Sequence, residues 1–415
     1  MAASTHDAVL TAKIDHFLEP LVRAHEFSGV VLVTRADKTL VARGYGKANW
    51  EFDAPMSMET LFRIASITKT FTGAAVVILA ERGRLALKDP LSKYLPDFPK
   101  GDKIQIRHLL LHESGVPNPD SRPCSDVTLD EVVSELAKKP LWFEPGTNSG
   151  YSNGGYALLA KVIEVVTGRR WEDVLRDEIF VPAGLMATAR DSDEAIVPLR
   201  AGGYVPGPSP LGLLKARCDS TRGLFGSGAL LSTASDLQRW ARVVRKETLF
   251  KRTALEYPYG WGVRKYYGRD AIEQSGISHG AASYLAEYFK DDVTIVVLSN
   301  VQTGVVDDIG KGVAALTFGI GPSPLKAAPR AVAATSALRK PWLGDWKNAN
   351  IGTFHLVERN GSLYQTWEAS IDGSYVFITG EHAAFNTQES GAMELAGDTL
   401  RISWGNGKPV EFKRP

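Results

Sequence analysis

The N-terminal part of the chain combines one helical apolar pattern with two strand patterns. The first apolar positions follow the three- and four-residue steps of a helix face, at Leu10, Ile14, Phe17, Leu18, Leu21 and Val22. Two β-rich runs, 28–35 and 39–45, follow and are separated by a short turn, so we expect a hairpin. A second apolar helix is predicted over 65–82.

The middle of the chain alternates helical segments with loops before strands return. Strands are predicted at 260–267, 271–275, 283–289 and 293–299, and a last helix at 305–318. Terminal helices can lie side by side on one face of an antiparallel sheet. The order therefore predicts an α+β fold over 1–320, in which a mostly helical insertion, about 84–245, forms an all-helical subdomain.

Beyond residue 320 the composition changes. Residues 321–340 are rich in Ala and Pro and are typical of a linker. Short alternating runs between Gly-containing turns then predict strands at 353–358, 363–368, 375–378, 393–395 and 399–404. We therefore expect a small all-β C-terminal domain, a sheet or barrel, over 341–415.

Composition narrows the partners of the protein. The 415 residues include 48 Lys+Arg and 47 Asp+Glu, a net charge of +1 that argues against nucleic acid. The longest apolar stretches are too short to span a membrane. No signal-peptide pattern opens the chain, but the compartment stays open because a removed signal would leave the same sequence. The two cysteines, Cys124 and Cys218, fit two unpaired thiols, which we favour, or one disulfide.

The strongest chemical signal is Ser66-Ile67-Thr68-Lys69 at the start of the apolar helix. Residues three apart share a helix face, so the lysine amine can lie beside the serine hydroxyl. A serine needs an adjacent base to become a nucleophile, and a desolvated lysine can be that base. An N-cap serine followed by a solvated lysine would look the same, so this motif alone decides nothing.

A second motif, Tyr151-Ser152-Asn153, lies in a loop that enters an apolar helix. A phenol close to a lysine cation has a lowered pKa, so Tyr151 could carry protons to and from Ser66. Asn153 could hold both a substrate amide and the lysine. The alternative is a buried tyrosine with a capping asparagine.

A third segment, Gln274-Ser275-Gly276-Ile277, is predicted to be a strand that borders the substrate cleft. Gly276 would allow a substrate to approach the strand backbone closely. A plain hairpin strand is the alternative for this segment. His108 and His112 are four apart and could share a metal, but no third ligand is evident, so we assign them structural roles and expect no metal or organic cofactor.

Together the three motifs resemble the penicillin-recognising serine hydrolases: class C β-lactamases, D-alanyl-D-alanine carboxypeptidases, D-aminopeptidases and related esterases. The resemblance spans about residues 8–320 and includes segments 109–115, 226–237 and 259–262. It implies a β-lactamase/transpeptidase-like catalytic domain followed by a lipocalin-like domain. It further implies that the nucleophile, base and proton shuttle are Ser66, Lys69 and Tyr151.

The resemblance also places Asn153 and the strand Gln274–Ile277 in substrate binding, with an oxyanion hole from the N–H groups of Ser66 and Ile277. Gln274 stands where the family has a lysine or histidine. An alternative register, His279-Gly280-Ala281, would restore a histidine but lies five residues too close to Tyr284. Neutral hydrogen bonds are weaker by roughly half, so we expect weaker activity on anionic substrates.

The substrate is less determined than the chemistry. Our first expectation is an amide or peptide hydrolase that takes D-residues or small unusual peptides and forms an acyl-enzyme on Ser66. A carboxylesterase is nearly level, and a β-lactamase comes third. A penicillin-binding sensor that is acylated without turnover is the alternative from another class. Association into a homo-oligomer is left open.

Overall fold

The computed structural model describes residues 5–36, 38–119, 127–192, 194–207, 209–216, 221–251, 259–327, 335–349, 352–359, 362–367, 374–380, 383–386, 391–404 and 408–415. Cys124 and Cys218, whose pairing the sequence leaves open, lie outside these residues.

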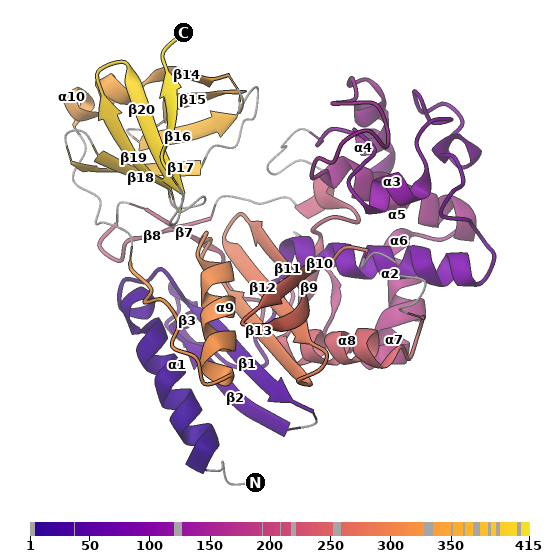
Figure 1. Ribbon diagram of the computed structural model, residues 1–415, viewed down its shortest axis with the longest axis horizontal. Coiled ribbons are helices and arrows are strands. Elements are labelled where there is room, and N and C mark those ends of the chain that lie inside the picture. The colour runs from indigo at the N-terminus through magenta and orange to yellow at the C-terminus, as the bar shows by residue number, and fades with distance from the viewer. Residues whose placement is uncertain are drawn as a thin grey trace.

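Within the described residues, a six-stranded antiparallel sheet joins the two ends of the predicted catalytic region (Figure 1). Strand β1 pairs with β13, with Gly29 opposite Ser299, so the N-terminal hairpin continues the later strands. The sheet runs in the order β10 (Gly262–Tyr266), β11 (Arg269–Ser278), β12 (Ala281–Tyr288), β13 (Val293–Ser299), β1 (Gly29–Arg35) and β2 (Lys38–Tyr45). The predicted strands are present, with ends shifted by a few residues.

The two faces of this sheet serve two separate cores. Val31 and Val33 pack with helices α1 (Thr5–Arg23) and α9 (Val306–Thr317), which lie together on one face (Figure 1). Val30 and Leu32 point to the opposite face, which α8 (Ala234–Lys246) covers. Successive side chains of a strand alternate between faces, so an uninterrupted run of valine and leucine suits a strand that is buried on both sides.

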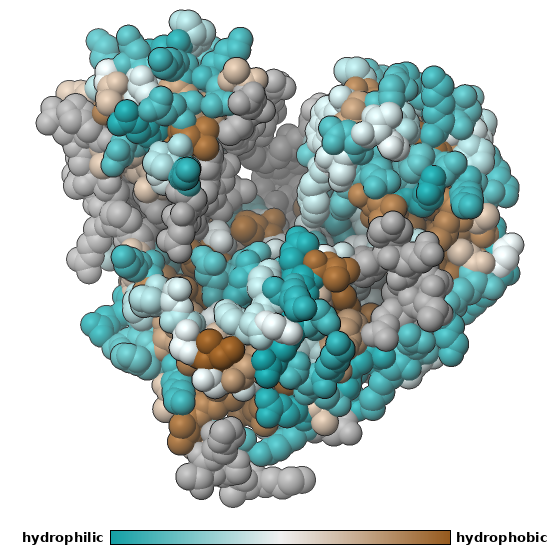
Figure 2. All heavy atoms as spheres, viewed as in Figure 1, coloured by the Kyte–Doolittle hydropathy of each residue, from teal (hydrophilic) through white to brown (hydrophobic). Residues whose placement is uncertain are grey.

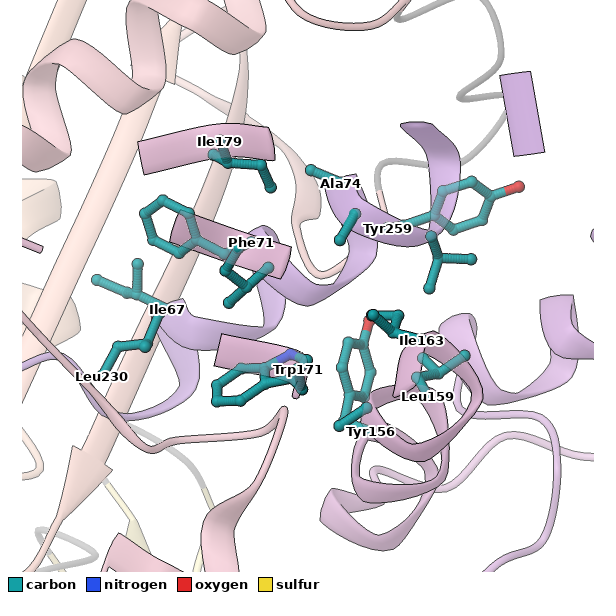
Figure 3. Close-up of a cluster of buried hydrophobic side chains, with 14 of the residues drawn as sticks. Ile67, Phe71, Ala74, Tyr156, Leu159, Ile163, Trp171, Ile179, Leu230 and Tyr259 are labelled. Atoms are coloured by element: carbon teal, nitrogen blue, oxygen red, sulfur yellow. The ribbon is translucent and has the colours of Figure 1, made fainter. Parts of the chain in front are cut away.

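Helix α2 (Thr68–Glu81) runs through the interior of the helical region and carries buried residues from Thr68 to Leu79. Phe71 stacks on Trp240 with ring centroids 4.5 Å apart and meets Phe180 edge-on at 5.5 Å. Figure 3 shows Phe71 and Ile67 beside Trp171 and Tyr156 in this core. A helix that is apolar on all sides is buried on all sides, which makes α2 a rigid support for the residues at its start.

The other elements of the helical region surround α2. The helices are α3 (Ile106–Leu110), α4 (Leu129–Ala137), α5 (Asn153–Thr167), α6 (Trp171–Leu175) and α7 (Val181–Ala183), with short turns η2 (Leu91–Lys93), η3 (Arg176–Phe180) and η4 (Thr221–Leu224). The described residues of the predicted insertion also include short strands, β6 (Ala189–Arg190), β7 (Tyr204–Pro206), β8 (Leu213–Lys215) and β9 (Leu230–Ser232). Before it lie β3 (Lys47–Asn49), β4 (Ala54–Pro55) and β5 (Phe62–Arg63).

The C-terminal strands close into a barrel, drawn in yellow in Figure 1. The short helices α10 (Ser336–Arg339) and η6 (Lys340–Trp342) precede it. The eight described strands are β14 (Gly344–Asn348), β15 (Gly352–Arg359), β16 (Ser362–Trp367), β17 (Ser374–Gly380), β18 (Ala383–Asn386), β19 (Gly391–Ala396), β20 (Thr399–Trp404) and β21 (Val410–Lys413). Pairing of β14 with β21 closes the ring, and an apolar interior fills it. The sequence predicted five of these strands and missed β14, β18 and β21.

On the face drawn in Figure 2, hydrophilic residues cover most of the described surface and the hydrophobic residues form small separate patches. In the described parts of the chain, no helix combines the length and the apolar character needed to cross a membrane.

Candidate active site

Ser66 lies in a single turn, η1 (Ala65–Ile67), that joins strand β5 to helix α2. Ala65 has a φ of +44°. This left-handed conformation costs a residue with a Cβ about 1–2 kcal/mol, so the surrounding structure holds a strained turn there. The turn places Ser66 at the start of α2, where the first N–H groups of a helix have no partner within the helix.

Lys69 is fully buried one helical turn from Ser66. Its Nζ lies 3.1 Å from Ser66 Oγ and donates to Asn153 Oδ1 and to the Ser227 carbonyl oxygen, each at 2.8 Å. Burial lowers the pKa of Lys69 well below its usual range. A neutral amine has two N–H groups and one lone pair, so the two carbonyl oxygens occupy both hydrogens and leave the lone pair for Ser66.

The Tyr151 hydroxyl donates to Ser66 Oγ at 2.7 Å. Half of this residue is exposed, but its hydroxyl end is enclosed by Ser66 and Gln274. Burial raises the pKa of Tyr151 to about 12, although hydrogen bonds with Ser66 and Gln274 partly offset the rise. Our expectation of a lowered phenol pKa is therefore wrong, because desolvation of the phenol outweighs these hydrogen bonds. Tyr151 keeps its proton at neutral pH.

The loop that carries Tyr151 is fixed by three hydrogen bonds. Ser152 caps α5, since its Oγ accepts the Gly155 N–H at 2.9 Å. The Ser152 N–H donates to His112 Nδ1 at 3.0 Å. The Asn153 N–H donates to Asn118 Oδ1 at 2.7 Å. These bonds leave the Asn153 side chain free to point at Lys69.

The opposite side of the site is the edge of strand β11. Pairing with β10 ends where Gly262 faces Glu273, so the described residues beyond that pair leave this edge open. Gln274 Nε2 donates to the Ser66 carbonyl oxygen at 3.4 Å, and its side chain also bonds Tyr151. His279 lies in the turn between β11 and β12. The structure thus brings Gln274 to Ser66, whereas Gly280 of the alternative register packs against Gly203 and Ala216.

Gly276 packs directly against the turn that holds Ser66. A Cβ at this position would lie 2.5 Å from Ser66 N and 2.9 Å from the Ile64 carbonyl oxygen. Its cross-strand neighbour Ser283 donates to the same Ile64 oxygen at 2.8 Å. A glycine is therefore required by the close approach of two backbones.

Ser275 and Ile277 turn their side chains to the other face of the sheet. They pair with Tyr284 and Ala282, which belong to the core under α9. The Ser275 hydroxyl bonds Asp307 at the start of α9, whose pKa is raised by burial. Any contact of these two residues with substrate would therefore involve the backbone.

Some contributors to the site were not predicted. The Ser227 carbonyl oxygen accepts from Lys69, and its sequence signal is the Gly-Ser-Gly turn at the start of the segment 226–237. Asn118 follows a proline in a loop and gives no sequence signal. His108 and His112 each accept a backbone N–H at Nδ1, from Gln105 and Ser152 respectively.

The geometry agrees with a match to a family model. The model described as Beta-lactamase matches residues 14–317. The chain belongs to the beta-lactamase family. The match ends before the barrel begins.

Curated relatives of this beta-lactamase family member include two bacterial proteins. A penicillin-binding protein of Bacillus subtilis (strain 168) is 30% identical over 319 residues, which cover 68% of this chain and 70% of the relative. A teichoic acid D-alanine hydrolase of Staphylococcus aureus (strain NCTC 8325 / PS 47) is 28% identical over 298 residues, or 70% and 73% of the two chains.

Two solved structures share the fold. The D-amino acid amidase of Ochrobactrum anthropi SV3, complexed with D-phenylalanine, has a TM-score of 0.68 at 22% identity and covers 75% of this chain and 99% of its own. An octameric penicillin-binding protein homologue of Pyrococcus abyssi has a TM-score of 0.67 at 21% identity, over 97% and 99%. At the level of class, the family match and the named relatives support a serine hydrolase.

Proposed function

We propose that this family member is a serine hydrolase that cleaves an amide or peptide bond of small D-residue substrates through an acyl-enzyme on Ser66. Lys69 is the base, Tyr151 is the acid that protonates the leaving group, and Asn153 binds the substrate. The N–H groups of Ser66 and Ile277 stabilise the oxyanion. Water then releases the acid with the same two proton carriers.

One observation carries the proposal: Ser66 Oγ lies 3.1 Å from the amine of a fully buried lysine whose two other partners are carbonyl oxygens. Both carbonyls accept hydrogen bonds and cannot take the Ser66 proton. The lone pair of Lys69 is therefore the acceptor for that proton when Ser66 attacks a carbonyl carbon. The bond to the leaving group then breaks in a second step.

The state of Tyr151 favours an amide over an ester. An amine leaves only after its nitrogen is protonated, whereas an alkoxide or phenolate leaves more readily. Tyr151 holds its proton at neutral pH and already donates to Ser66 Oγ at 2.7 Å, which places an acid beside the reacting centre. The D-residue preference is supported by the names of two relatives, a teichoic acid D-alanine hydrolase and a D-amino acid amidase.

Gln274 argues against an efficient β-lactamase. Its neutral amide contacts Ser66 and Tyr151 at the point where the family carries a cation. A substrate carboxylate would find no charge there, and neutral hydrogen bonds are roughly half as strong as charge-assisted ones. The same neutrality favours uncharged esters, so a carboxylesterase is the second candidate.

The test is steady-state hydrolysis of D-alanine p-nitroanilide, a linear peptide, p-nitrophenyl acetate and a chromogenic cephalosporin, with Ser66→Ala alongside. We expect turnover of the D-alanine anilide that the variant lacks, together with a Ser66 adduct in the intact mass. Preference for the acetate would identify the esterase. A single stoichiometric burst without turnover would identify a penicillin-binding sensor, and activity that survives in Ser66→Ala would refute the assigned nucleophile.

The domain division of 1–320, 321–340 and 341–415 is supported by the end of the family match at residue 317. Self-association is supported by the octameric homologue, and light scattering of the full chain would test it.

A further inference from the structure

His112 packs against both tyrosines of the site. Its ring stacks on Tyr151 with centroids 4.5 Å apart and an angle of 29°, and it is tilted against Tyr156 at 5.2 Å. Lys69 Nζ lies over the same two phenol rings, 4.8 Å and 5.6 Å from their centroids. The ring of His112 and two tyrosine rings from the start of α5 therefore gather around the amine that faces Ser66.

The backbone conformation of His112 and a hydrogen bond to its ring fix the orientation and the protonation of the imidazole. Its φ is +60°, in the left-handed region that histidine and asparagine enter more readily than most residues. Its Nδ1 accepts the Ser152 N–H at 3.0 Å, so the single proton of the neutral ring lies on Nε2. Burial first, and the nearby Lys69 second, lower the pKa of His112 to about 4. The imidazole is therefore uncharged at neutral pH.

We propose that His112 is the positioning residue of Tyr151. The His112 ring stacks on the phenol and its Nδ1 holds the loop through Ser152. The Tyr151 hydroxyl therefore stays on Ser66 Oγ, and water is kept away from Lys69. This inference rests on the proposed function, because it assigns His112 a part in activating Ser66. An uncharged ring is suited to this place. Lys69 becomes a cation during the attack, and an imidazolium beside it would oppose that change.

The electrostatic surroundings of Lys69 are otherwise simple. Among the described residues, the titratable side chains that face it are Tyr151 before α5, Tyr156 on α5 and His112 after α3, with Tyr259 next to Tyr156. Burial is the only cause of its lowered pKa. Water admitted by the loss of the His112 ring would therefore raise the pKa of Lys69, and acylation would begin at higher pH.

Two variants separate the stacking from the hydrogen bond. His112→Asn suits the left-handed backbone and can still accept the Ser152 N–H, but it has no ring. His112→Phe keeps a ring against Tyr151 but cannot accept that N–H. The measurement is the rate constant for labelling of Ser66 by a fluorophosphonate probe from pH 5 to 11, in the full chain, with Ser66→Ala as the blank and Tm recorded for each protein.

We expect His112→Asn to label Ser66 about 10- to 100-fold more slowly, because displacement of a catalytic group by about 1 Å costs up to about that much. We also expect the acidic side of its pH–rate profile, where labelling rises as Lys69 loses its proton, to shift up by about one pH unit. His112→Phe should have a lower Tm but the wild-type pH–rate profile. The inference alone is overturned if the wild type is labelled and His112→Asn has the same labelling rate constant and the same pH dependence. It is overturned too if both variants lose rate only in step with Tm. An unlabelled wild type would overturn the proposed hydrolase and this inference together.

Discussion

The two sides of the site are built on different principles. The helical side consists of Lys69, Tyr151, Asn153 and His112, whose side chains hydrogen-bond to Ser66, to one another or to nearby backbone groups. The strand side is the open edge of β11, where Gly276 brings backbone into contact with Ser66 and the Gln274 side chain hydrogen-bonds to Ser66 and Tyr151. The helical side determines where the protons lie, and the strand side determines the shape of the site.

This difference teaches which substitutions each side tolerates. On the helical side the chemical identity of a group matters, because a buried amine without its carbonyl partners would be left unpaired and would not be oriented toward Ser66. On the strand side the backbone of β11 makes the contact with η1, so a side chain can change if that contact stays intact. The departure of Gln274 from the family pattern falls on the tolerant side.

The largest effect is expected at the base. Lys69→Ala should slow acylation of Ser66 by about 10²- to 10⁴-fold, because no other described group accepts the Ser66 proton. Stopped-flow acylation with an activated ester measures this rate. Lys290→Ala, which removes an exposed lysine, is the matched control and should behave as the wild type. A Lys69→Ala rate within threefold of the wild type would rule out the lysine as the base.

Removal of the Tyr151 hydroxyl should come next. Tyr151→Phe should lower kcat on a D-alanine anilide by about 10²-fold and on an activated ester by much less, since only the amine needs an acid to leave. The wild-type kcat should rise with pH as Lys69 loses its proton, and the lowered pKa of Lys69 places this rise well below pH 10.5. It should fall only near the Tyr151 pKa of about 12. The variant should lack the alkaline fall. Equal losses on both substrates would contradict the assignment of Tyr151 as the acid.

A change of shape on the strand side should have a moderate effect. Gly276→Ala would place a methyl 2.5 Å from Ser66 N, and overpacking of this kind costs about 1–3 kcal/mol. We expect a lower Tm and about a tenfold fall in kcat, as η1 shifts. Gly321→Ala meets no atom within 4 Å and is the matched control. If both variants had the same Tm and kcat, the close approach would not be needed.

The smallest effect is expected at Gln274. Gln274→His should leave activity on a neutral ester within a few-fold and raise kcat/KM for a cephalosporin carboxylate by up to about tenfold, because a charge-assisted hydrogen bond is about twice as strong as a neutral one. The gain should be larger at pH 6 than at pH 8, since the histidine must be protonated. No gain at either pH would show that the neutral glutamine does not limit the anionic substrates.

The pattern of the sequence predicted much of the fold. The β-branched runs at 28–35 and 293–299 are buried on both faces, and that requires helices on each side of the sheet. Strands β14, β18 and β21 escaped prediction because short barrel strands of four or five residues alternate too briefly to stand out. The short strands of the helical region escaped for the same reason.

The site divides in the same way. The spacing of Ser66 and Lys69, and the Tyr-x-Asn motif before α5, determined which groups would meet, since one helix face and one capped loop fix their directions. The tertiary structure alone decided their protonation. Whether a lysine is a cation depends on how much water reaches it, and burial is a sum over segments far apart in the chain. The same enclosure raised the pKa of Tyr151 and set His112 against its ring, neither of which a local pattern can encode.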